Sequence, residues 1–308
     1  MRQYFLKLLN IFSILWIPIV VPLSLLLEVY KKLFRCKSIK SIDGDIAVVT
    51  GGGGGLGRAI SMELAKHGCH VAVVDVNYEE AQKTVQLINE NYKVYTKAYK
   101  VDITNYDEIV ELNKNITSDL GKATILINNA GILYFSDILE PEPSEVQRMI
   151  NVNFTSHFWT NRVFLENMKE LGKGHIVAIS SVAGLNPLPF FSVYAGTKHA
   201  VRGLMRTLRI ELKMDANCSG IRTTIVYPTP LDTNSVALDI IRKLKLNRLF
   251  GVQTGDAMAK RIIQGMLRNE VEITRPDERL FFIKCTEFWP TELYDWVTAN
   301  IFFGHLKK

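Results

Sequence analysis

Cysteine and histidine are scarce in this sequence, and neither residue gathers into a cluster. The 308 residues include four cysteines and six histidines. The cysteines are spread from Cys36 to Cys285, and no two have the spacing of a metal site or a redox motif. The sequence therefore predicts no metal site, no disulfide framework and free thiols in a reducing compartment. It also contains no internal repeat and no low-complexity tract, which excludes a repeat architecture.

Acidic residues are missing from the short segment between residues 31 and 40. The chain has a formal net charge of +6, which by itself would suggest a nucleic-acid partner. However, basic residues crowd into this one segment: Lys31, Lys32, Arg35, Lys37 and Lys40. Because the cluster directly follows an apolar run, it favours a membrane surface, and we expect no nucleic-acid partner.

Charged residues are also absent from the run Leu8–Leu27. As a helix this run would be about 30 Å long, which matches the hydrocarbon core of a bilayer. The alternatives are a cleaved signal peptide or a buried core helix, but no small-x-small cleavage site follows and no polar face is present. Pro18 and Pro22 would kink the helix, so it either spans once or forms a re-entrant hairpin. The sequence predicts an N-terminal membrane anchor with a basic flank at residues 1–40, and a cytosolic domain after it.

Residues 41–308 alternate short β-branched runs with helical patterns, and this alternation predicts one α/β domain. The predicted strands are Ile46–Val49, His70–Val74, Val94–Lys100, Ile125–Ile127, His175–Ser180 and Arg222–Val226. Helical patterns such as Arg58–His67 and Asp107–Leu120 separate them. Alternation of this kind favours a doubly wound parallel sheet, a Rossmann fold, in which ligands bind at the carboxyl ends of the strands.

A glycine-rich turn follows the first predicted strand and precedes a helix. Five glycines, Gly51 to Gly55, are followed by Leu56 and Gly57. Glycines allow a backbone to approach a pyrophosphate closely, and the N-terminus of the next helix favours an anion. Asp75 ends the second strand, where a carboxylate binds the adenosine ribose. Neither the turn nor the residue after Asp75 supplies a cation for a 2′-phosphate, so we expect NAD(H) rather than NADP(H).

Further motifs occur in a fixed order after this turn: Asp102, Asn128-Asn129-Ala130-Gly131, Ser181 and Tyr194-x3-Lys198. Together with Thr50-Gly51-x3-Gly55-x-Gly57, they resemble the short-chain dehydrogenase/reductase family over about residues 45–235. The NNAG motif and the short C-terminal portion resemble its single-domain branch. Asn153–Thr160 and the apolar N-terminus are more similar to the epidermal retinol dehydrogenases and the 17-beta-hydroxysteroid dehydrogenases of lipid droplets.

The resemblance implies a set of cofactor-binding residues. They are Gly51, Gly55, Leu56 and Gly57 at the pyrophosphate, Asp75 and Asn129 at the riboses, Asp102 and Ile103 at the adenine, and Pro228 and Thr233 at the nicotinamide. One position departs from the family pattern. Thr229 follows Pro228 where the family usually has glycine, so the backbone there and the placement of Thr233 are open.

The resemblance also implies the catalytic residues Asn153, Ser181, Tyr194 and Lys198. Tyrosine with its ordinary pKa of ~10 is a poor base near neutrality. Lys198 lies one helical turn after Tyr194, so its positive charge is expected to lower the pKa of the phenol and, in the family, to hold the nicotinamide ribose. Ser181 would orient the substrate oxygen, and Asn153 would complete a proton relay through water. An isolated YxxxK pattern would instead indicate a tyrosine and a solvated lysine on one helix.

The substrate is indicated by two less specific segments. Residues 230–250 correspond to the family's substrate loop and are rich in apolar residues, while residues 280–303 are rich in aromatics. The second segment either packs on the core or forms a surface at the headgroup boundary of a membrane. We expect an enzyme that transfers hydride between NAD(H) and a hydrophobic alcohol or carbonyl, such as a retinoid, a steroid or a fatty alcohol.

The resemblance places this enzyme at the endoplasmic reticulum membrane or a lipid droplet, with its catalytic domain facing the cytosol, and is compatible with a homo-oligomer. Two alternatives stay open. One is an NADP-dependent carbonyl reductase of the same family. The other is a non-catalytic lipid-droplet or membrane protein that keeps the fold.

Overall fold

The computed structural model describes residues 39–233 and 251–304, together with residues 19, 20, 22, 23, 26, 238–240 and 242. The chain divides into two compact units, Met1–Ile39 and Lys40–Lys308. All of the helices and strands discussed below belong to the second unit.

The described part of this unit contains one sheet of seven parallel strands. The strands are β1 (Ile46–Thr50), β2 (His70–Asp75), β3 (Thr96–Lys100), β4 (Ile125–Asn128), β5 (Gly174–Ile179), β6 (Ile221–Tyr227) and β7 (Glu272–Thr274). Their order in the sheet is β3-β2-β1-β4-β5-β6-β7, and every neighbouring pair is parallel. The strand order reverses between β1 and β4. This topology confirms the predicted doubly wound Rossmann fold, whose binding crevice opens at such a reversal.

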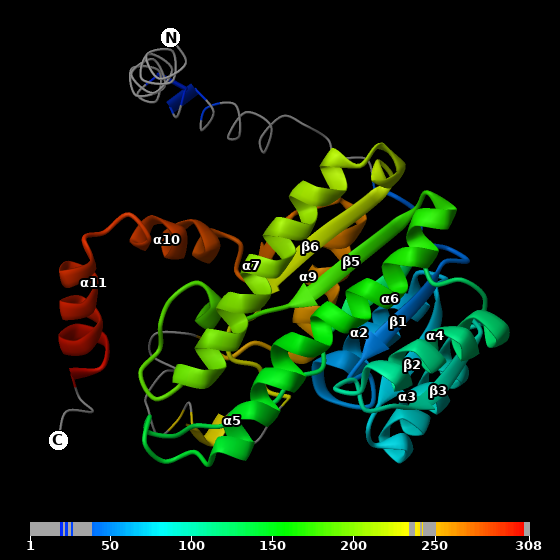
Figure 1. Ribbon diagram of the computed structural model, residues 1–308, viewed down its shortest axis with the longest axis horizontal. Coiled ribbons are helices and arrows are strands. Elements are labelled where there is room, and N and C mark those ends of the chain that lie inside the picture. The colour runs from blue at the N-terminus through cyan, green and yellow to red at the C-terminus, as the bar shows by residue number, and fades with distance from the viewer. Residues whose placement is uncertain are drawn as a thin grey trace, which may run out of the picture. The chain divides into compact units, whose positions relative to one another are not determined.

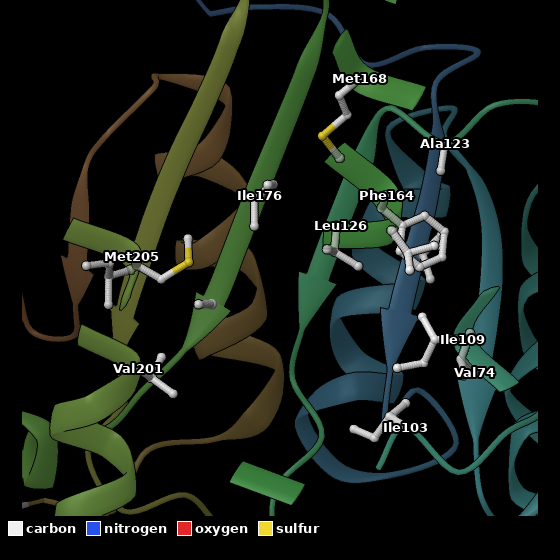
Figure 2. Packing of buried hydrophobic residues seen from close by; sticks show 14 of the residues in the cluster. Val74, Ile103, Ile109, Ala123, Leu126, Phe164, Met168, Ile176, Val201 and Met205 are labelled. Atoms are coloured by element: carbon white, nitrogen blue, oxygen red, sulfur yellow. The ribbon is translucent and has the colours of Figure 1, made fainter. Parts of the chain in front are cut away.

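Alternate residues of each strand are buried on opposite faces of the sheet, which is why the strands read as continuous apolar runs. Val48, Leu126 and Ile176 belong to the hydrophobic cluster on one face, whereas Val49 and Ile127 belong to the cluster on the other face. Figure 2 shows the first cluster, in which strand residues such as Leu126 and Ile176 lie close to helical residues such as Phe164 and Met205.

In the described part of the chain, three long helices cover each face of the sheet. Helices α4 (Tyr106–Asp119), α6 (Ser156–Leu171) and α7 (Ser192–Met214) contribute to the first cluster. Helices α2 (Gly55–Lys66), α3 (Tyr78–Asn91) and α9 (Gly255–Leu267) contribute to the second. Figure 1 shows α6 in front of the sheet and α9 behind it. Asparagine side chains begin two of these helices: Asn77 accepts from Glu80 N and Asn105 from Asp107 N.

Shorter elements complete the described chain. They are α5 (Pro143–Ile150), the π-helical turn η1 (Asn151–Thr155), η2 (Val182–Gly184), η3 (Ala216–Cys218), α10 (Glu278–Thr286), α11 (Thr291–Val297) and η5 (Thr298–Phe302). Because η1 joins α5 directly to α6, residues 143–171 form one helical stretch with a widened turn in the middle. Widened turns of this kind frequently occur at functional sites.

The predicted strands agree with the observed ones to within one or two residues, and one strand was not predicted. The third strand begins at Thr96 rather than Val94. The unpredicted strand is β7, which has only three residues and begins with Glu272. It carries too short an apolar run to be distinguished from a loop, and it becomes a strand because Val226 and Tyr227 of β6 provide a parallel neighbour.

Most of the predicted N-terminal anchor, residues 1–40, lies outside the described residues. Ile19, Val20, Leu23 and Leu26 of the apolar run are described, and all four are helical and exposed. Within the described residues no helix combines the length and the apolar character that crossing a bilayer requires.

The aromatic C-terminal segment exposes most of its large apolar side chains. The exposed fraction is 65% for Phe281, 67% for Phe282 and 88% for Phe288. Helix α11 contains no buried residue. Ile283 and Phe303 are buried, so packing on the core accounts for only part of this segment.

Candidate functional site

The glycine-rich turn between β1 and α2 has the close backbone approach that a pyrophosphate-binding loop requires. Gly51 and Gly55 have positive φ angles of 62° and 52°, which favour glycine. A Cβ atom at Gly57 would lie only 2.0 Å from the carbonyl oxygen of Gly51. The turn therefore cannot accept side chains at these positions, and its N–H groups precede the N-terminus of α2. These features fit a dinucleotide pyrophosphate.

Asp75 lies at the carboxyl end of β2 and faces the glycine turn. Its carboxylate accepts hydrogen bonds from Gly53 N and Asn77 N, both at 2.9 Å. A carboxylate has about four acceptor positions, so two remain for ribose hydroxyl groups.

A cation that the sequence analysis passed over, Arg58, lies beside the same turn. Its Nη2 forms an ion pair of 2.8 Å with Glu80, and its Nε donates to Thr84 at 3.0 Å. The guanidinium is already bound to Glu80, Thr84 and the carbonyl of Gly53. Because Glu80 neutralises it, the carboxylate of Asp75 is the main charge that an adenosine ribose would meet at this turn.

Asn129 supports the glycine turn from β4. Its Nδ2 donates to the carbonyls of Thr50 and Gly51 at 3.0 and 3.1 Å, and its backbone N donates to Thr50 Oγ1 at 3.0 Å. Asn129 therefore holds the end of β1 against the end of β4, at the reversal of strand order.

Asp102 and Ile103 follow β3 and lie farther along the same edge of the sheet. Asp102 is exposed, and its carboxylate accepts from Thr104 N at 2.9 Å and from Thr104 Oγ1 at 2.8 Å. Ile103 is buried in the hydrophobic cluster below (Figure 2). Asp102 is thus the more accessible of the two residues predicted at the adenine.

A cavity of about 240 Å³ opens at the carboxyl edge of the sheet, beyond β4, β5 and β6. Its wall contains seven of the predicted site residues: Leu56, Asn129, Ser181, Tyr194, Lys198, Pro228 and Thr233. Much of the remaining wall is apolar and comes from Ile132, Leu133, Leu188, Phe191, Leu231 and Ile240. A polar cluster at the base and an apolar wall are the usual features of a pocket for a hydrophobic small molecule.

Tyr194 and Ser181 meet in this wall. Ser181 Oγ accepts from Ala183 N at 3.1 Å, and the side chain of Ser181 also interacts with the phenol of Tyr194. Burial raises the pKa of Tyr194 above its ordinary value, and the hydrogen bond from Ser181 opposes this rise. The expectation that the pKa of the phenol lies below its ordinary value is therefore wrong. Desolvation of the phenolate outweighs the favourable contacts.

Lys198 lies one turn after Tyr194 on α7 and is almost fully buried. Its Nζ donates to the carbonyl of Ile179 at 3.0 Å and lies 5.6 Å from the centre of the Tyr194 ring. Burial lowers the pKa of Lys198 to about 8. The lysine is therefore not the solvated side chain that an isolated YxxxK pattern would indicate.

Asn153 is fully buried in the widened turn η1, and it reaches the same site from behind. Its Oδ1 accepts from Ile132 N at 2.8 Å and its Nδ2 donates to Ile132 O at 2.9 Å. A Cβ built on Gly131 would lie 3.4 Å from Asn153 Oδ1 and 3.5 Å from Lys198 Nζ. Asn153 and Lys198 thus converge on Gly131, and the Asn153 amide fixes the segment that follows the NNAG motif.

Thr229, which replaces the usual glycine, lies buried in the wall of the cavity. Pro228, Thr229 and Thr233 all belong to its wall. Thr229 is buried, and its hydroxyl has no hydrogen-bond partner within the described part of the chain. Thr233 lies close to Gly55, where an added Cβ would be 3.4 Å from the threonine Cβ. Thr233 therefore lies between the glycine turn and the cavity. The threonine at position 229, in place of the usual glycine, does not move Thr233 away from the site.

One buried titratable residue near this site, His157, was not predicted from the sequence. His157 follows Asn153 by one turn, and neither of its ring nitrogens has a partner among the residues described. Burial, followed by the positive charge of Lys198, lowers the pKa of His157 to about 3. It therefore stays neutral behind the cationic lysine. No spacing in the sequence links His157 to Lys198, because α6 and α7 meet only in the folded chain.

Comparisons with known proteins agree with this geometry. The sequence profile described as short chain dehydrogenase matches residues 45–239. Estradiol 17-beta-dehydrogenase 11 of Pongo abelii is 30% identical over 278 residues, which cover 90% of this chain and 89% of that protein. The 17-beta-hydroxysteroid dehydrogenase 13 of Homo sapiens is 31% identical over 264 residues, covering 86% and 85%.

Solved structures share the fold. A short chain dehydrogenase/reductase from Burkholderia phymatum in complex with NAD has a TM-score of 0.72 at 23% identity, covering 80% of this chain and 94% of that one. A metagenomic short-chain oxidoreductase in complex with NADP has a TM-score of 0.64 at 24% identity, covering 76% and 97%. The two complexes contain different cofactors, NAD in the first and NADP in the second.

Proposed function

Since this chain belongs to the short-chain dehydrogenase family and is an oxidoreductase of that family, we propose that it transfers hydride between NAD(H) and a hydrophobic alcohol or carbonyl compound. The observation that carries this proposal is the convergence of Ser181, Tyr194 and Lys198 in the wall of one largely apolar cavity. The bound nicotinamide would supply or accept the hydride. The protein's own side chains must then move and hold the proton.

Tyr194 is the proposed acid and base of the reaction. In oxidation its phenolate takes the hydroxyl proton of the alcohol, and in reduction its phenol returns a proton to the carbonyl oxygen. Ser181 donates a hydrogen bond at the same point and orients the reacting oxygen. Because burial raises the pKa of Tyr194, the phenol is mainly protonated at neutral pH, which suits reduction. Oxidation then requires the positive charge of Lys198 to stabilise the phenolate.

Lys198 and Asn153 are assigned supporting roles. The Lys198 ammonium is held by the carbonyl of Ile179, and we assign its remaining N–H groups to the nicotinamide ribose. The side-chain amide of Asn153 is engaged with Ile132 on both its donor and acceptor sides. Asn153 therefore positions the segment after Gly131, and we propose that it also completes the proton relay through water.

NAD is the proposed cofactor rather than NADP. The free acceptor positions of Asp75 suit the two hydroxyl groups of an adenosine ribose, whereas a 2′-phosphate would be repelled by the carboxylate. Arg58, the guanidinium beside the glycine turn, is paired with Glu80 at 2.8 Å. It would have to leave this ion pair to bind a 2′-phosphate.

The proposed substrates are retinoids, steroids and fatty alcohols or the corresponding carbonyls. The apolar part of the cavity wall supports an apolar substrate. The names of two relatives, estradiol 17-beta-dehydrogenase 11 and 17-beta-hydroxysteroid dehydrogenase 13, make a steroid hydroxyl the first compound to test. Most of the predicted substrate loop, residues 230–250, lies outside the described residues, so the choice within this class depends on assay.

Association with the endoplasmic reticulum membrane or a lipid droplet is also proposed. The exposed Phe281, Phe282 and Phe288 are the kind of side chain that partitions into the headgroup boundary. The uncharged run Leu8–Leu27 supports a second attachment. An enzyme held at a lipid surface in this way could receive a hydrophobic substrate directly from it.

A turnover assay of the full chain tests the proposed function. The protein is incubated with NAD or NADP and a panel of steroids, retinols and long-chain fatty alcohols, and the reverse reaction is followed with the carbonyl compounds. We expect NAD-dependent oxidation of at least one class. Turnover with NADP alone would support the NADP-dependent reductase instead, and no turnover together with lipid-droplet binding would support a non-catalytic protein.

A further inference from the structure

A second cavity, of about 150 Å³, lies at the amino edge of the sheet, on the opposite side from the cofactor site. The residues around it precede or begin four different strands. Asp45 precedes β1, Thr124 precedes β4, Lys173 and His175 flank the start of β5, and Arg222 lies at the start of β6. None of these residues has a part in the proposed reaction.

Positive charge is in excess around this cavity. Its wall contains three cationic side chains, Lys40, Lys173 and Arg222, and one carboxylate, Asp45. Lys173 Nζ is paired with Asp45 Oδ1 at 2.6 Å, and the Asp45 side chain is only 10% exposed. Arg222 Nη1 donates to the backbone carbonyls of Ser219 and Ile221 at 2.6 and 3.1 Å, so these partners carry no charge. In the described wall, the three cations therefore exceed the single carboxylate by two.

A chain of hydrogen bonds holds Lys40 at the cavity wall. Lys40 Nζ lies 2.7 Å from His175 Nδ1, and His175 Nε2 lies 2.8 Å from Thr224 Oγ1, which donates to the carbonyl of Glu270. Since an ammonium can only donate, Nδ1 must accept and the histidine proton is on Nε2. His175 is therefore neutral. It anchors one N–H of Lys40, and the described residues offer no second acceptor for the ammonium.

The pKa directions agree with an excess of cations around the cavity. The pKa of Lys40 is lowered to about 8, mainly by burial. Asp45 opposes this shift, and the positive charges of Lys173 and Arg222 add to it. Burial and the charges of Lys40 and Arg222 bring the pKa of His175 well below its ordinary value. An anion in the cavity would reverse the repulsion among these groups.

We propose that this amino-edge cavity binds a phosphate group, with Lys40 and Arg222 as its principal donors. A phosphate monoester has a charge between −1 and −2 at neutral pH and three strong acceptor oxygens, which matches the two cations left without a carboxylate. A lysine supplies a point charge and an arginine a planar set of donors, and both are usual phosphate ligands. The phosphate comes either from the headgroup of an anionic lipid or from free phosphate in solution.

The position of Lys40 in the chain favours the lipid headgroup as the source. Lys40 is the first residue of the catalytic unit, directly after the unit Met1–Ile39. That preceding unit carries the uncharged run and most of the basic flank. Twelve residues separate the end of this run at Leu27 from Lys40, and basic segments next to a membrane-embedded run are attracted to anionic headgroups.

Isothermal titration of the full-length protein in a neutral detergent tests the site. Saturating NADH is present throughout, so that phosphate cannot enter the glycine turn, and inorganic phosphate is compared with chloride at equal ionic strength. Lys40→Gln and Arg222→Gln should each weaken phosphate binding by about fivefold. The matched control is Lys213→Gln, an exposed lysine at the end of α7 that does not line the cavity, and it should leave the affinity unchanged.

A second arm of the titration distinguishes the two sources. Short-chain phosphatidic acid and short-chain phosphatidylcholine replace inorganic phosphate. Tighter binding of phosphatidic acid than of inorganic phosphate, lost in the same two variants, identifies a lipid headgroup, and equal affinity identifies free phosphate. The proposal is overturned if no phosphate compound binds, or if Lys40→Gln and Arg222→Gln bind phosphate as tightly as Lys213→Gln. Turnover with a soluble alcohol should stay at the wild-type rate in all three variants, so a failure here is distinguishable from a failure of the proposed enzymatic function.

Discussion

The two ends of strand β5 each contact a lysine, which is half-buried at the amino end and buried at the carboxyl end, and the surroundings of the two lysines differ. At the carboxyl end, Lys198 donates to the carbonyl of Ile179, and burial is the cause of its lowered pKa. At the amino end, Lys40 contacts His175, and the charges of Lys173 and Arg222 add to the effect of burial. Both pKa values fall to about 8.

Two lysines with a similarly lowered pKa can therefore have different functions, one in proton transfer and the other in anion binding. A single desolvated ammonium beside a phenol provides a strong local field that acts on one oxygen atom, which suits proton transfer at Tyr194. Several cations around a cavity provide a diffuse field that attracts a whole anion, which suits binding. Among the described residues, the cavity at the carboxyl edge therefore contains one cationic side chain, Lys198, whereas three cationic side chains surround the cavity at the amino edge.

Replacing Tyr194 should break the chemistry of the carboxyl edge without affecting the amino edge. In Tyr194→Phe the proton acceptor is lost while the ring keeps its packing, so kcat should fall by ~10²–10⁴-fold. NAD affinity and phosphate affinity at the Lys40 cavity should stay near the wild-type values. Steady-state kinetics and titration measure these quantities, and Tyr106→Phe on α4, whose ring packs on Trp159, serves as the control. Near-normal turnover in Tyr194→Phe would remove the assignment of the acid and base.

Substitutions that change the cofactor preference should alter binding at the carboxyl edge only. Phosphate affinity at the amino-edge cavity should stay the same. Asp75→Asn combined with Val76→Arg removes the carboxylate that repels a 2′-phosphate and adds a cation. Like-charge repulsion of this kind is worth several kcal/mol, so the ratio of NAD to NADP affinity should fall by about 100-fold. The amide oxygen introduced by Asp75→Asn can still accept a hydrogen bond, which protects the turn at Gly53.

The matched control for this pair of substitutions is Glu79→Gln, which removes one exposed carboxylate from the first turn of α3. It should leave the ratio unchanged. A wild-type protein that already binds NADP more tightly than NAD would contradict the assignment of Asp75.

The sequence predicted the carboxyl edge much better than the amino edge, for a physical reason. Chemistry at the carboxyl edge depends on short local patterns, such as Tyr194 and Lys198 one helical turn apart or glycines in one turn. Even so, the raised pKa of Tyr194 was not predicted, because desolvation depends on which distant segments cover the phenol. The neutral His157 was missed for the same reason, since α7 brings Lys198 next to it only in the folded chain.

The amino-edge cavity has no local pattern at all. Lys40, Lys173 and Arg222 belong to three separate parts of the sequence. Lys40 was predicted only as part of the basic flank, and Lys173 and Arg222 each resemble an ordinary surface cation. The strand order β1-β4-β5-β6 brings them to one cavity. The same limit applies to β7, whose three residues form a strand only because β6 is beside them.

Removing the isolated charge at the carboxyl edge should stabilise the fold while it destroys function. The pKa of Lys198 is about 8 in the folded protein and 10.5 when unperturbed, a difference that corresponds to about 3 kcal/mol. After the loss of one hydrogen bond worth ~1 kcal/mol, Lys198→Met should gain about 2 kcal/mol at neutral pH. Its turnover and its NAD affinity should both fall, because the phenolate and the nicotinamide ribose lose their cation.

The pH dependence gives the sign of this effect. A lysine whose pKa is lower in the folded state opposes folding below pH 8, where it must be charged in the interior. This cost shrinks as the pH rises from about 8 to 10.5. Denaturant unfolding of wild type and Lys198→Met should therefore show the largest difference in free energy of unfolding at neutral pH, with convergence toward pH 10.5. A difference that grows with pH would contradict the buried charge.

The smallest expected effect concerns the hydrogen bonds that hold Lys40 at the amino edge. Thr224→Val keeps the shape of the side chain but removes the acceptor for His175 Nε2 and the donor to the carbonyl of Glu270. Leaving a buried N–H without a partner costs about 1–3 kcal/mol, so the free energy of unfolding should fall by ~1 kcal/mol or slightly more. Turnover should be unchanged, because Thr224 does not belong to the wall of the cavity that contains Tyr194. The control is Thr223→Val on the neighbouring position of β6, where the described residues provide no partner for the hydroxyl.

Equal stability of the two variants in denaturant unfolding would show that the chain of hydrogen bonds from Lys40 to Glu270 is not maintained in solution. Loss of turnover in Thr224→Val alone would show that the two ends of β5 are coupled, and the contrast between them would have to be abandoned.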